Sequence, residues 1–218
     1  CLVTLELMGI TVSFNSAPLE WWLSLPIIVI YPLLFGWVSY QTATKLAEHK
    51  RRLQVMSTRD GMTGVYNRRH WETMLRNEFD NCRRHNRDAT LLIIDIDHFK
   101  SINDTWGHDV GDEAIVALTR QLQLTLRGSD VIGRFGGDEF AVIMSGTPAE
   151  SAITAMLRVH EGLNTLRLPN TPQVTLRISV GVAPLNPQMS HYREWLKSAD
   201  LALYKAKKAG RNRTEVAA

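Results

Sequence analysis

Four acidic residues stand next to features that could bring them together. Asp95 ends an apolar run, and Asp97 follows two positions later, on the same face if the run is a strand. Asp138 and Glu139 come directly after a glycine pair (136–137), which lets phosphates approach the backbone. Converging carboxylates repel one another unless a cation neutralises them. Oxygen-only ligands select a hard ion, Mg²⁺ in a phosphate site, where two ions can activate a hydroxyl and stabilise leaving pyrophosphate.

Each half of this pattern also has a simpler explanation. An acid at a strand end is often only the cap of the turn or helix that follows. An acidic hairpin can likewise lie on the surface without binding anything. The position of the hairpin relative to the strand of Asp95 separates these interpretations.

The surrounding sequence predicts an α/β fold with helices packed on a central sheet. Residues 89–94 (ATLLII) are typical of a short buried strand. The runs VIGRF and EFAVIM, on either side of Gly136-Gly137-Asp138, predict a hairpin. Alternation predicts a long strand over residues 173–183. Helical spacing predicts helices over residues 109–126, 148–167 and 191–209, the last one ending at Gly210.

An uncharged apolar segment precedes this domain. Residues 21–41 are long enough to cross a bilayer as a helix, and tryptophans and a tyrosine lie near the two ends. A signal peptide fits poorly because the basic residues follow the run, whereas a buried core helix is the remaining alternative. Lys45, Lys50, Arg51 and Arg52 come next, so the positive-inside rule places the following domain in the cytoplasm. The apolar residues 1–14 are expected to be the end of an earlier membrane helix.

These features divide the chain into three parts. We expect the end of a membrane domain over residues 1–44, a helical linker over 45–57 and a catalytic domain over 58–218. The linker helix is either a solvated connector or a stalk that pairs two subunits, since two heptads do not decide for a coiled coil. The chain begins with Cys rather than Met, which favours the C-terminal piece of a longer protein.

Composition limits the function classes. The 218 residues suit one ordinary domain with a short extra segment. The net charge of +3 is modest, and no Lys/Arg block is interleaved with aromatics, so the sequence predicts no nucleic-acid partner. Two cysteines, Cys1 and Cys82, are too few for a disulfide framework and have no zinc-type spacing.

Five ordered blocks over residues 58–214 resemble the GGDEF-domain diguanylate cyclases, in particular membrane-bound enterobacterial members. RFGGDEF (134–140) looks like the family signature, and TRDGMTGVYNRR (58–69) resembles its opening block, with Met62 and Val65 where leucine is usual. The other blocks are DIDHFKSINDTWGHDVGD (95–112), SVGVA (179–183) and ADLALYKAKKAGRN (199–212). The resemblance implies a nucleotidyl cyclase-like domain with a central, mainly antiparallel sheet flanked by helices.

The resemblance also implies an activity. Two GTP molecules would be condensed into cyclic di-GMP, with two Mg²⁺ ions per active site, or Mn²⁺ in their place. Each subunit would bind one GTP, so the chemistry requires a homodimer, tethered to the bilayer by the predicted span. The alternatives are a catalytically inactive domain that binds cyclic di-GMP or a partner protein, and a mononucleotide cyclase. Inactive members usually lose the signature acids or glycines, which are all present here.

Site roles follow from the same resemblance, position by position. Asp95, Asp138 and the carbonyl of Ile96 match metal ligands, and Glu139 matches a catalytic or metal-binding glutamate. The positions that match substrate-binding groups are Gly136 and Gly137 at the hairpin, His98, Phe99 and Lys100 at a helix N-terminus, Asn103 and Asp112 for guanine, and Lys207 with Arg211, which are expected at i and i+4 on one helix face. Arg127 and Asp130 have the spacing of a product-inhibition site, with Arg158 as a further candidate.

Overall fold

The computed structural model describes residues 3–7, 10–14, 30–46, 58–169, 171 and 173–217. They fall into two compact units, Cys1–Met56 and Ser57–Ala218. The first unit contains strands β1 (Val3–Leu7) and β2 (Ile10–Phe14), paired antiparallel, and a helix over residues 30–46. The expectation that residues 1–14 end a membrane helix is therefore wrong, and their β-branched residues account for the strands.

The predicted membrane span over residues 21–41 lies only partly within the described chain. Residues 30–41 belong to the helix over 30–46, whereas 21–29 lie outside the described residues. Among the described segments, no helix has both the length and the apolar character needed to cross a membrane. The predicted linker is described only as far as residue 46, because residues 47–57 lie outside the described chain.

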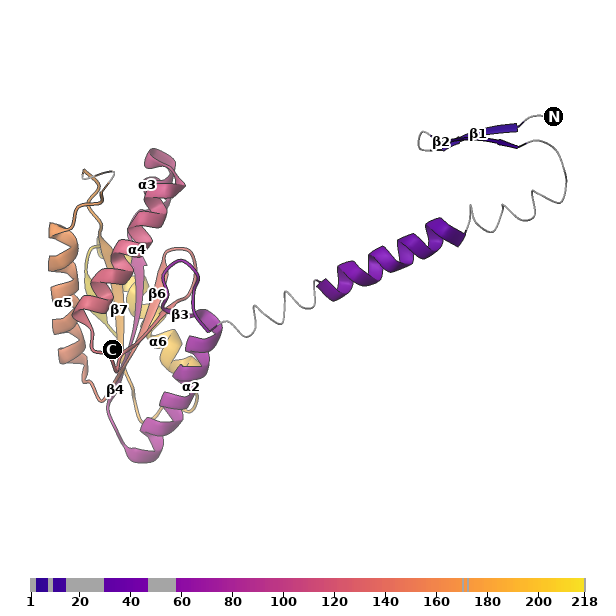
Figure 1. The fold of residues 1–218 in the computed structure, drawn as a ribbon. Helices are drawn as coiled ribbons and strands as arrows, with labels where there is room; N and C mark the ends of the chain where they lie inside the picture. Colours follow the sequence, from indigo (N-terminus) through magenta and orange to yellow (C-terminus); the bar gives the residue numbers. More distant parts are fainter. Residues whose placement is uncertain are drawn as a thin grey trace. The chain divides into compact units, whose positions relative to one another are not determined.

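The second unit is built on a six-stranded sheet with the order β3-β5-β6-β4-β7-β8. Strands β3, β6, β4 and β7 are labelled in Figure 1. Its strands are β3 (Tyr66–Asn67), β4 (Ala89–Ile96), β5 (Val131–Arg134), β6 (Glu139–Ser145), β7 (Ile178–Pro184) and β8 (Thr214–Val216). The three inner pairings are antiparallel, and the two edge pairings, β3 with β5 and β7 with β8, are parallel. The predicted α/β fold is confirmed, with a sheet that is antiparallel at its centre and mixed as a whole.

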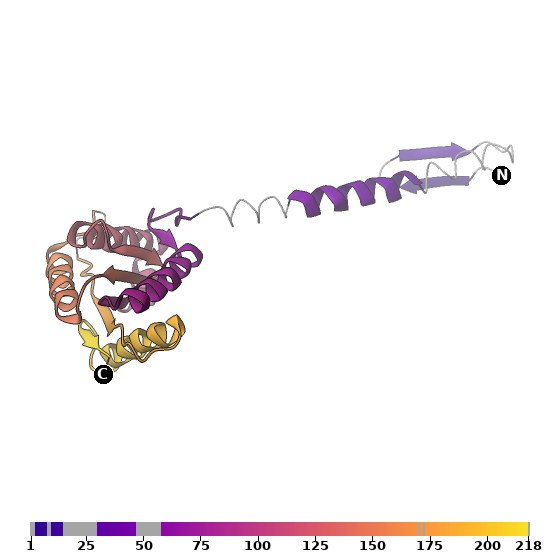
Figure 2. The ribbon, with the colours of Figure 1, turned by 90° about the horizontal axis from the view of Figure 1, so that it is seen from below.

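Five helices accompany the sheet in this unit, within the part of the chain that is described. They are α2 (Arg68–His85), α3 (Phe99–Trp106), α4 (His108–Thr125), α5 (Ala149–Thr165) and α6 (Tyr192–Lys208). Figure 2 shows helices on both faces of the sheet. The predicted helices over 109–126, 148–167 and 191–209 are confirmed: the first is shifted by one residue, and the other two are slightly shorter. Helix α2 and strands β3 and β8 were not predicted.

Strand alternation divides the core into two layers. Leu92 and Ile94 of β4 pack with the buried faces of α4 and α5, whereas Leu91 and Ile93 pack with α2 and α6. All eight residues of β4 are buried, which explains the unbroken apolar run that ends at Asp95. The strand places the carboxylate of Asp95 at the end of the core.

Close contact between α6 and β7 depends on a glycine. A Cβ at Gly181 would overlap the backbone of Ala199 and Leu203, so only glycine lets the helix lie this near the strand. The indole of Trp195 donates to the carbonyl of Ala183 at 2.8 Å and fixes the other end of the contact. This packing holds the C-terminal turn of α6, with Lys207, beside the end of β4.

The long strand predicted over residues 173–183 is shorter than expected. β7 begins at Ile178, whose partner on β4 is Ile96, the last residue of that strand. Residues before 178 have no strand to pair with on that side, because the chain after Ile96 turns into α3. Residues 173–177 therefore alternate between exposed and buried side chains without forming strand hydrogen bonds to a neighbour.

Candidate active site

The acidic residues come together at one end of the sheet. Asp95 of β4 is paired with Glu139 of β6 on one side and with Ser179 of β7 on the other. The amide of Ile96 donates to the carbonyl of Asp138 at 3.3 Å, which holds the start of the hairpin against β4. Directly paired residues project from the same face of a sheet, so the carboxylates of Asp95 and Glu139 are neighbours.

The carboxyl group of Asp95 lies in a poorly solvated position. Its residue is only 8% exposed, and burial raises the pKa of the carboxyl above its usual value. The ammonium of Lys207 lies 2.7 Å from Oδ2 and opposes that rise, whereas the charges of Asp138 and Glu139 add to it. Lys207 therefore supplies the positive charge that balances this carboxylate.

The oxygen atoms around Asp95 suit a hard cation. Within the described residues, no three His, Cys, Asp or Glu side chains are gathered as a ready-made metal cluster. The candidate metal ligands here are nevertheless all oxygens: the carboxylates of Asp95, Asp138 and Glu139, and the carbonyl of Ile96 at the strand end. Asp138 and Glu139 are near enough to raise the pKa of Asp95, so their mutual repulsion favours a shared cation. The residues fit Mg²⁺ by charge and donor type.

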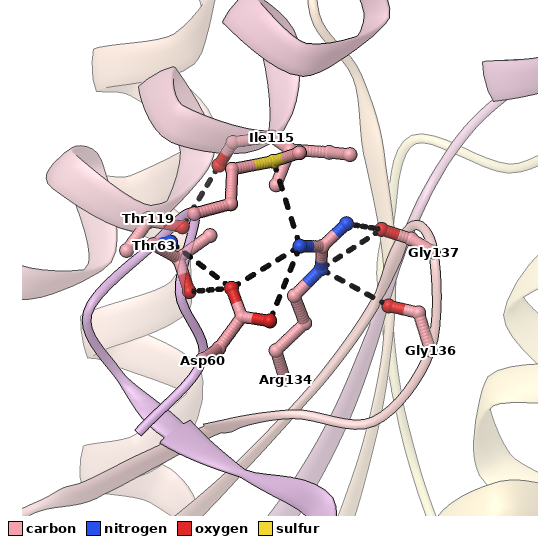
Figure 3. A network of polar contacts seen from close by, with 8 residues as sticks. Asp60, Thr63, Ile115, Thr119, Arg134, Gly136 and Gly137 are labelled. Carbon is pink, nitrogen blue, oxygen red and sulfur yellow. Dashed lines mark hydrogen bonds and ion pairs between the residues drawn. The ribbon is translucent and has the colours of Figure 1, made fainter. Parts of the chain in front are cut away.

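Arg134 fixes the turn of the hairpin from inside (Figure 3). Its Nε donates to the carbonyls of Gly136 and Gly137 at 3.2 and 3.1 Å, and Nη2 donates to Gly137 at 2.8 Å. Its Nη1 donates to Oδ1 of Asp60 at 3.1 Å, and the side chain is only 14% exposed. One guanidinium thus joins the glycine turn to the loop that precedes α2.

Asp60 is held in turn by its own loop. The backbone N–H and the hydroxyl of Thr63 both donate to Oδ1, at 3.0 and 2.6 Å. Burial alone would raise the pKa of Asp60, but the hydrogen bonds from Thr63 and Arg134 outweigh it and hold the pKa below its usual value. Asp60 and Arg134 were missing from the predicted site, although both stand inside the quoted blocks 58–69 and 134–140.

The two predicted guanine-binding residues lie on packed helices, α3 and α4. Oδ1 of Asn103 is buried against Gly111, where a Cβ would overlap it, and accepts no hydrogen bond within the described chain. Asp112, the next residue, is exposed beside a groove of about 500 Å³ that Arg120 and Pro169 also line. The structure therefore brings Asn103 to the helix turn that carries Asp112.

Of the predicted phosphate-binding residues, those at 98–100 begin a helix as expected, whereas Lys207 and Arg211 differ from expectation. His98 occupies the N-cap of α3 with φ +58, so the helix begins at Phe99, and Lys100 is exposed in its first turn. Lys207 lies on α6, but the helix ends at Lys208 and Gly210 has φ +112. Arg211 follows with φ +63, so the prediction that Lys207 and Arg211 share a helix face is wrong.

The predicted product-inhibition residues line one pocket, of about 180 Å³, together with residues of α5. Arg127, Asp130 and Arg158 all contribute to its wall. The backbone N–H of Arg127 donates to Oδ2 of Asp130 at 2.9 Å, while Oδ1 is buried and accepts no hydrogen bond from the described residues. Burial raises the pKa of Asp130, opposed by this hydrogen bond and by the charge of Arg127. Two exposed arginines therefore line the pocket, and the carboxylate of Asp130 keeps one buried oxygen without a partner among the described residues.

Comparison with known families agrees with the fold. The profile of the family described as "Diguanylate cyclase, GGDEF domain" matches residues 57–213. This chain belongs to the GGDEF-domain diguanylate cyclase family. The resemblance seen in the motif blocks is thereby confirmed.

Individual relatives support the same assignment. The chain is 99% identical over 218 residues to the probable diguanylate cyclase DgcC of Escherichia coli strain K12, covering 100% of this chain and 59% of that protein. It is 35% identical over 159 residues to diguanylate cyclase DosC of the same strain, covering 72% of this chain and 34% of DosC. The chain thus spans about three fifths of the length of DgcC and one third of that of DosC.

A solved structure shows the same domain with a nucleotide bound. The GGDEF domain of DgcB from Caulobacter crescentus, in complex with c-di-GMP, superimposes with a TM-score of 0.70 at 30% identity. The match covers 73% of this chain and 93% of that one.

The Asp60–Arg134 ion pair generates a pH-dependent prediction. Because the folded pKa of Asp60 lies below the usual 3.8, its charged form stabilises the fold above about pH 4, and this contribution is lost as the pH falls through the folded pKa. We expect Asp60→Asn to lower the free energy of unfolding by roughly 1 kcal/mol at pH 7, where a partly exposed, hydrogen-bonded pair is broken.

Urea denaturation at pH 7 and pH 3 measures this difference, with Asp104→Asn, an exposed acid on α3, as the matched control. The gap between wild type and Asp60→Asn should shrink at pH 3. An equal gap at both pH values would contradict the prediction.

Proposed function

We propose that this chain condenses two GTP molecules into cyclic di-GMP and two pyrophosphates. The observation that carries the proposal is the placement of Asp95, Asp138 and Glu139 at one strand end, beside a glycine turn without side chains. The family assignment and the GGDEF domain of DgcB bound to c-di-GMP support it.

The reaction is the same phosphoryl transfer carried out twice. The 3′-oxygen of one GTP bonds to the α-phosphorus of the other, and the bond from that phosphorus to the oxygen bridging to the β-phosphate breaks. The hydroxyl proton passes to a base as pyrophosphate leaves. Glu139, exposed beside Asp95, is the carboxylate available to accept it. Mg²⁺ held by Asp95, Asp138 and the carbonyl of Ile96 would lower the pKa of the hydroxyl and compensate charge on the leaving group.

The remaining residues bind and orient the substrate. Exposed Gly136 and Gly137 let the triphosphate approach the hairpin backbone, which Arg134 holds in one conformation. The backbone N–H groups of Phe99 and Lys100 belong to the first turn of α3, which no side chain of His98 caps, and they suit the β- and γ-phosphates. Lys207 and Arg211 contribute positive charge to the terminal phosphate. Asp112, which is exposed, accepts from the N1–H and N2–H₂ donors of guanine, and Asn103 is the second acceptor once its buried Oδ1 turns toward the base.

Dimerisation follows from the stoichiometry of the reaction. Each domain presents one acidic strand end, whereas the product needs two reciprocal attacks. Two copies related by a two-fold axis satisfy this requirement, because each then brings its own 3′-hydroxyl to the α-phosphate bound by the other.

Removal of either signature acid tests the proposed chemistry. We expect Asp138→Ala or Glu139→Ala to lower cyclic di-GMP formation at least about 100-fold, because the triphosphate charge is less compensated and the hydroxyl less activated. Asp104→Ala should keep wild-type turnover. Mass spectrometry of products after incubation with GTP and Mg²⁺ measures all three variants.

The same measurement separates the alternatives. An unmodified chain that binds cyclic di-GMP but makes no product would be a receptor, and one that makes a cyclic mononucleotide would be a different cyclase. Wild-type turnover in Asp138→Ala or Glu139→Ala would refute the assigned roles of these acids.

We further propose that the pocket at Arg127, Asp130 and Arg158 binds the product and slows the enzyme. A guanidinium can donate to the O6 and N7 atoms of guanine, and a carboxylate such as that of Asp130 can accept from the N–H groups on the opposite edge of the base. Cyclic di-GMP carries two guanines, so it can bridge two domains in an orientation where the GTP sites do not meet. The simpler alternative is that Arg127 only ends α4 and Asp130 only caps its turn.

Progress curves with and without added product test this inhibition. Wild type should slow as cyclic di-GMP accumulates, whereas Arg127→Ala should stay near its initial rate because the guanine loses its donor pair. Arg87→Ala, an exposed arginine after α2 that lines neither this pocket nor the groove beside Asp112, is the control and should slow like wild type. Equal insensitivity of wild type and Arg127→Ala would show that the pocket is not an inhibitory site.

We also propose that residues 21–41 tether the domain to the bacterial inner membrane, with the domain in the cytoplasm. The support is the absence of charge over this run and the cluster of basic residues after it. The expected likeness to membrane-bound enterobacterial cyclases stays a prediction. In cell fractionation, the chain from residue 1 should sediment with membranes after a carbonate wash, and the chain from residue 58 should remain in the supernatant. The same distribution for both would contradict the tether.

A further inference from the structure

Asp97 is a buried carboxylate that none of the roles above uses. It is 5% exposed and lies just beyond the end of β4, two residues after Asp95. Its backbone N–H donates to the carbonyl of Arg177 at 2.9 Å, which fixes the residue against the start of β7. A buried carboxylate is costly unless its oxygens receive hydrogen bonds, so its partners indicate what it does.

Both oxygens of Asp97 accept a hydrogen bond, from two different parts of the chain. The hydroxyl of Ser179, on β7, donates to Oδ1 at 2.7 Å. The backbone N–H of Asn212 donates to Oδ2 at 2.8 Å. The second contact spans 115 residues and reaches the segment that follows α6.

That segment has an unfavourable backbone. Gly210, Arg211 and Asn212 have φ values of +112, +63 and +45, so three consecutive residues are left-handed. Glycine adopts this conformation easily, but arginine rarely does. Two backbone hydrogen bonds hold this segment on either side of Asn212. The amide of Arg211 donates to the carbonyl of Ala206, and the carbonyl of Arg213 accepts from the amide of Val180. Asp97 supplies the restraint between them.

We propose that Asp97 is a positioning residue, which clamps the segment 210–213 and thereby holds Arg211 beside the triphosphate. The inference rests on the proposed role of Arg211 in binding GTP. Asp97 itself touches no substrate. A carboxylate suits the task because both partners are donors: Oδ2 accepts from the segment, and Oδ1 accepts from Ser179.

The clamp is tested first on the segment itself, without GTP. Trypsin cleaves after Arg211, and mass spectrometry under native conditions gives the rate relative to cleavage after Arg167, in a different loop. We expect Asp97→Ala to raise this ratio about tenfold, the change in local opening that the loss of a charge-assisted hydrogen bond produces. Ser179→Ala removes the other partner of Asp97 and should leave the ratio unchanged. An unchanged ratio in Asp97→Ala overturns the clamp.

A measurement on the unmodified chain covers the case in which Asp97→Ala does not fold. The N–H of Asn212 belongs to an exposed residue, so without the clamp it would exchange with deuterium at the rate of an open loop. The proposal predicts that this amide is protected. Exchange of the Asn212 amide at the open-loop rate overturns the proposal.

Kinetics then show whether the clamp acts through Arg211. We expect Asp97→Ala and Arg211→Ala each to raise the KM for GTP by about tenfold, and the double variant to resemble Arg211→Ala alone, since coupled residues are not additive. Effects that multiply would mean that Asp97 acts independently of Arg211, which overturns the positioning role. A wild-type KM and kcat in Arg211→Ala would instead refute the proposed role of Arg211, while proteolysis and amide exchange still decide on the clamp.

Discussion

The central constraint in this domain is the repulsion between carboxylates at the end of a fully buried strand. Asp95 has lost most of its contact with water, and its neighbours Asp138 and Glu139 make its ionised form less stable still. The fold compensates with Lys207, which is available only because α6 lies close on β7 at Gly181. A cation bound with the substrate would compensate the same negative charge. The repulsion between the carboxylates that favours Lys207 in the folded state therefore also favours binding of a cation.

The sequence predicted the parts of this arrangement that local patterns encode. The apolar run of β4, the glycine turn between β5 and β6, and the periodic faces of α4, α5 and α6 all have signals within one element. Asp95, Asp138 and Glu139 could be predicted as site residues because they lie at a strand end and beside a glycine pair, where the chain leaves the core. The pairing of Asp95 with Glu139 depends on the register between β4 and β6. The sequence suggested that the hairpin lies beside β4, but it did not specify this register.

Other features depend on partners far away in the chain and were missed for that reason. Arg134 holds the glycine turn through Asp60, 74 residues earlier, and neither residue type indicates such a contact by itself. Arg211 was expected on the face of α6 because a four-residue spacing looks helical, yet Gly210 ends the helix and the backbone turns left-handed. Residues 1–14 were expected to end a membrane helix because of their apolar composition. The segments Val3–Leu7 and Ile10–Phe14, which are rich in β-branched residues, instead form paired strands.

Helix α4 has a consequence for how regulation and substrate recognition are linked. Asp112 stands in the second turn of α4 and Arg127 just beyond its last turn, so about 20 Å of helix separates them, at 1.5 Å rise per residue from residue 112 to the helix end at Thr125. A molecule in the pocket at Arg127 is too far away to displace a base at Asp112. If the proposed roles hold, raising the GTP concentration would not relieve the inhibition, and cyclic di-GMP would set a ceiling on turnover whatever the supply of nucleotide in the cell.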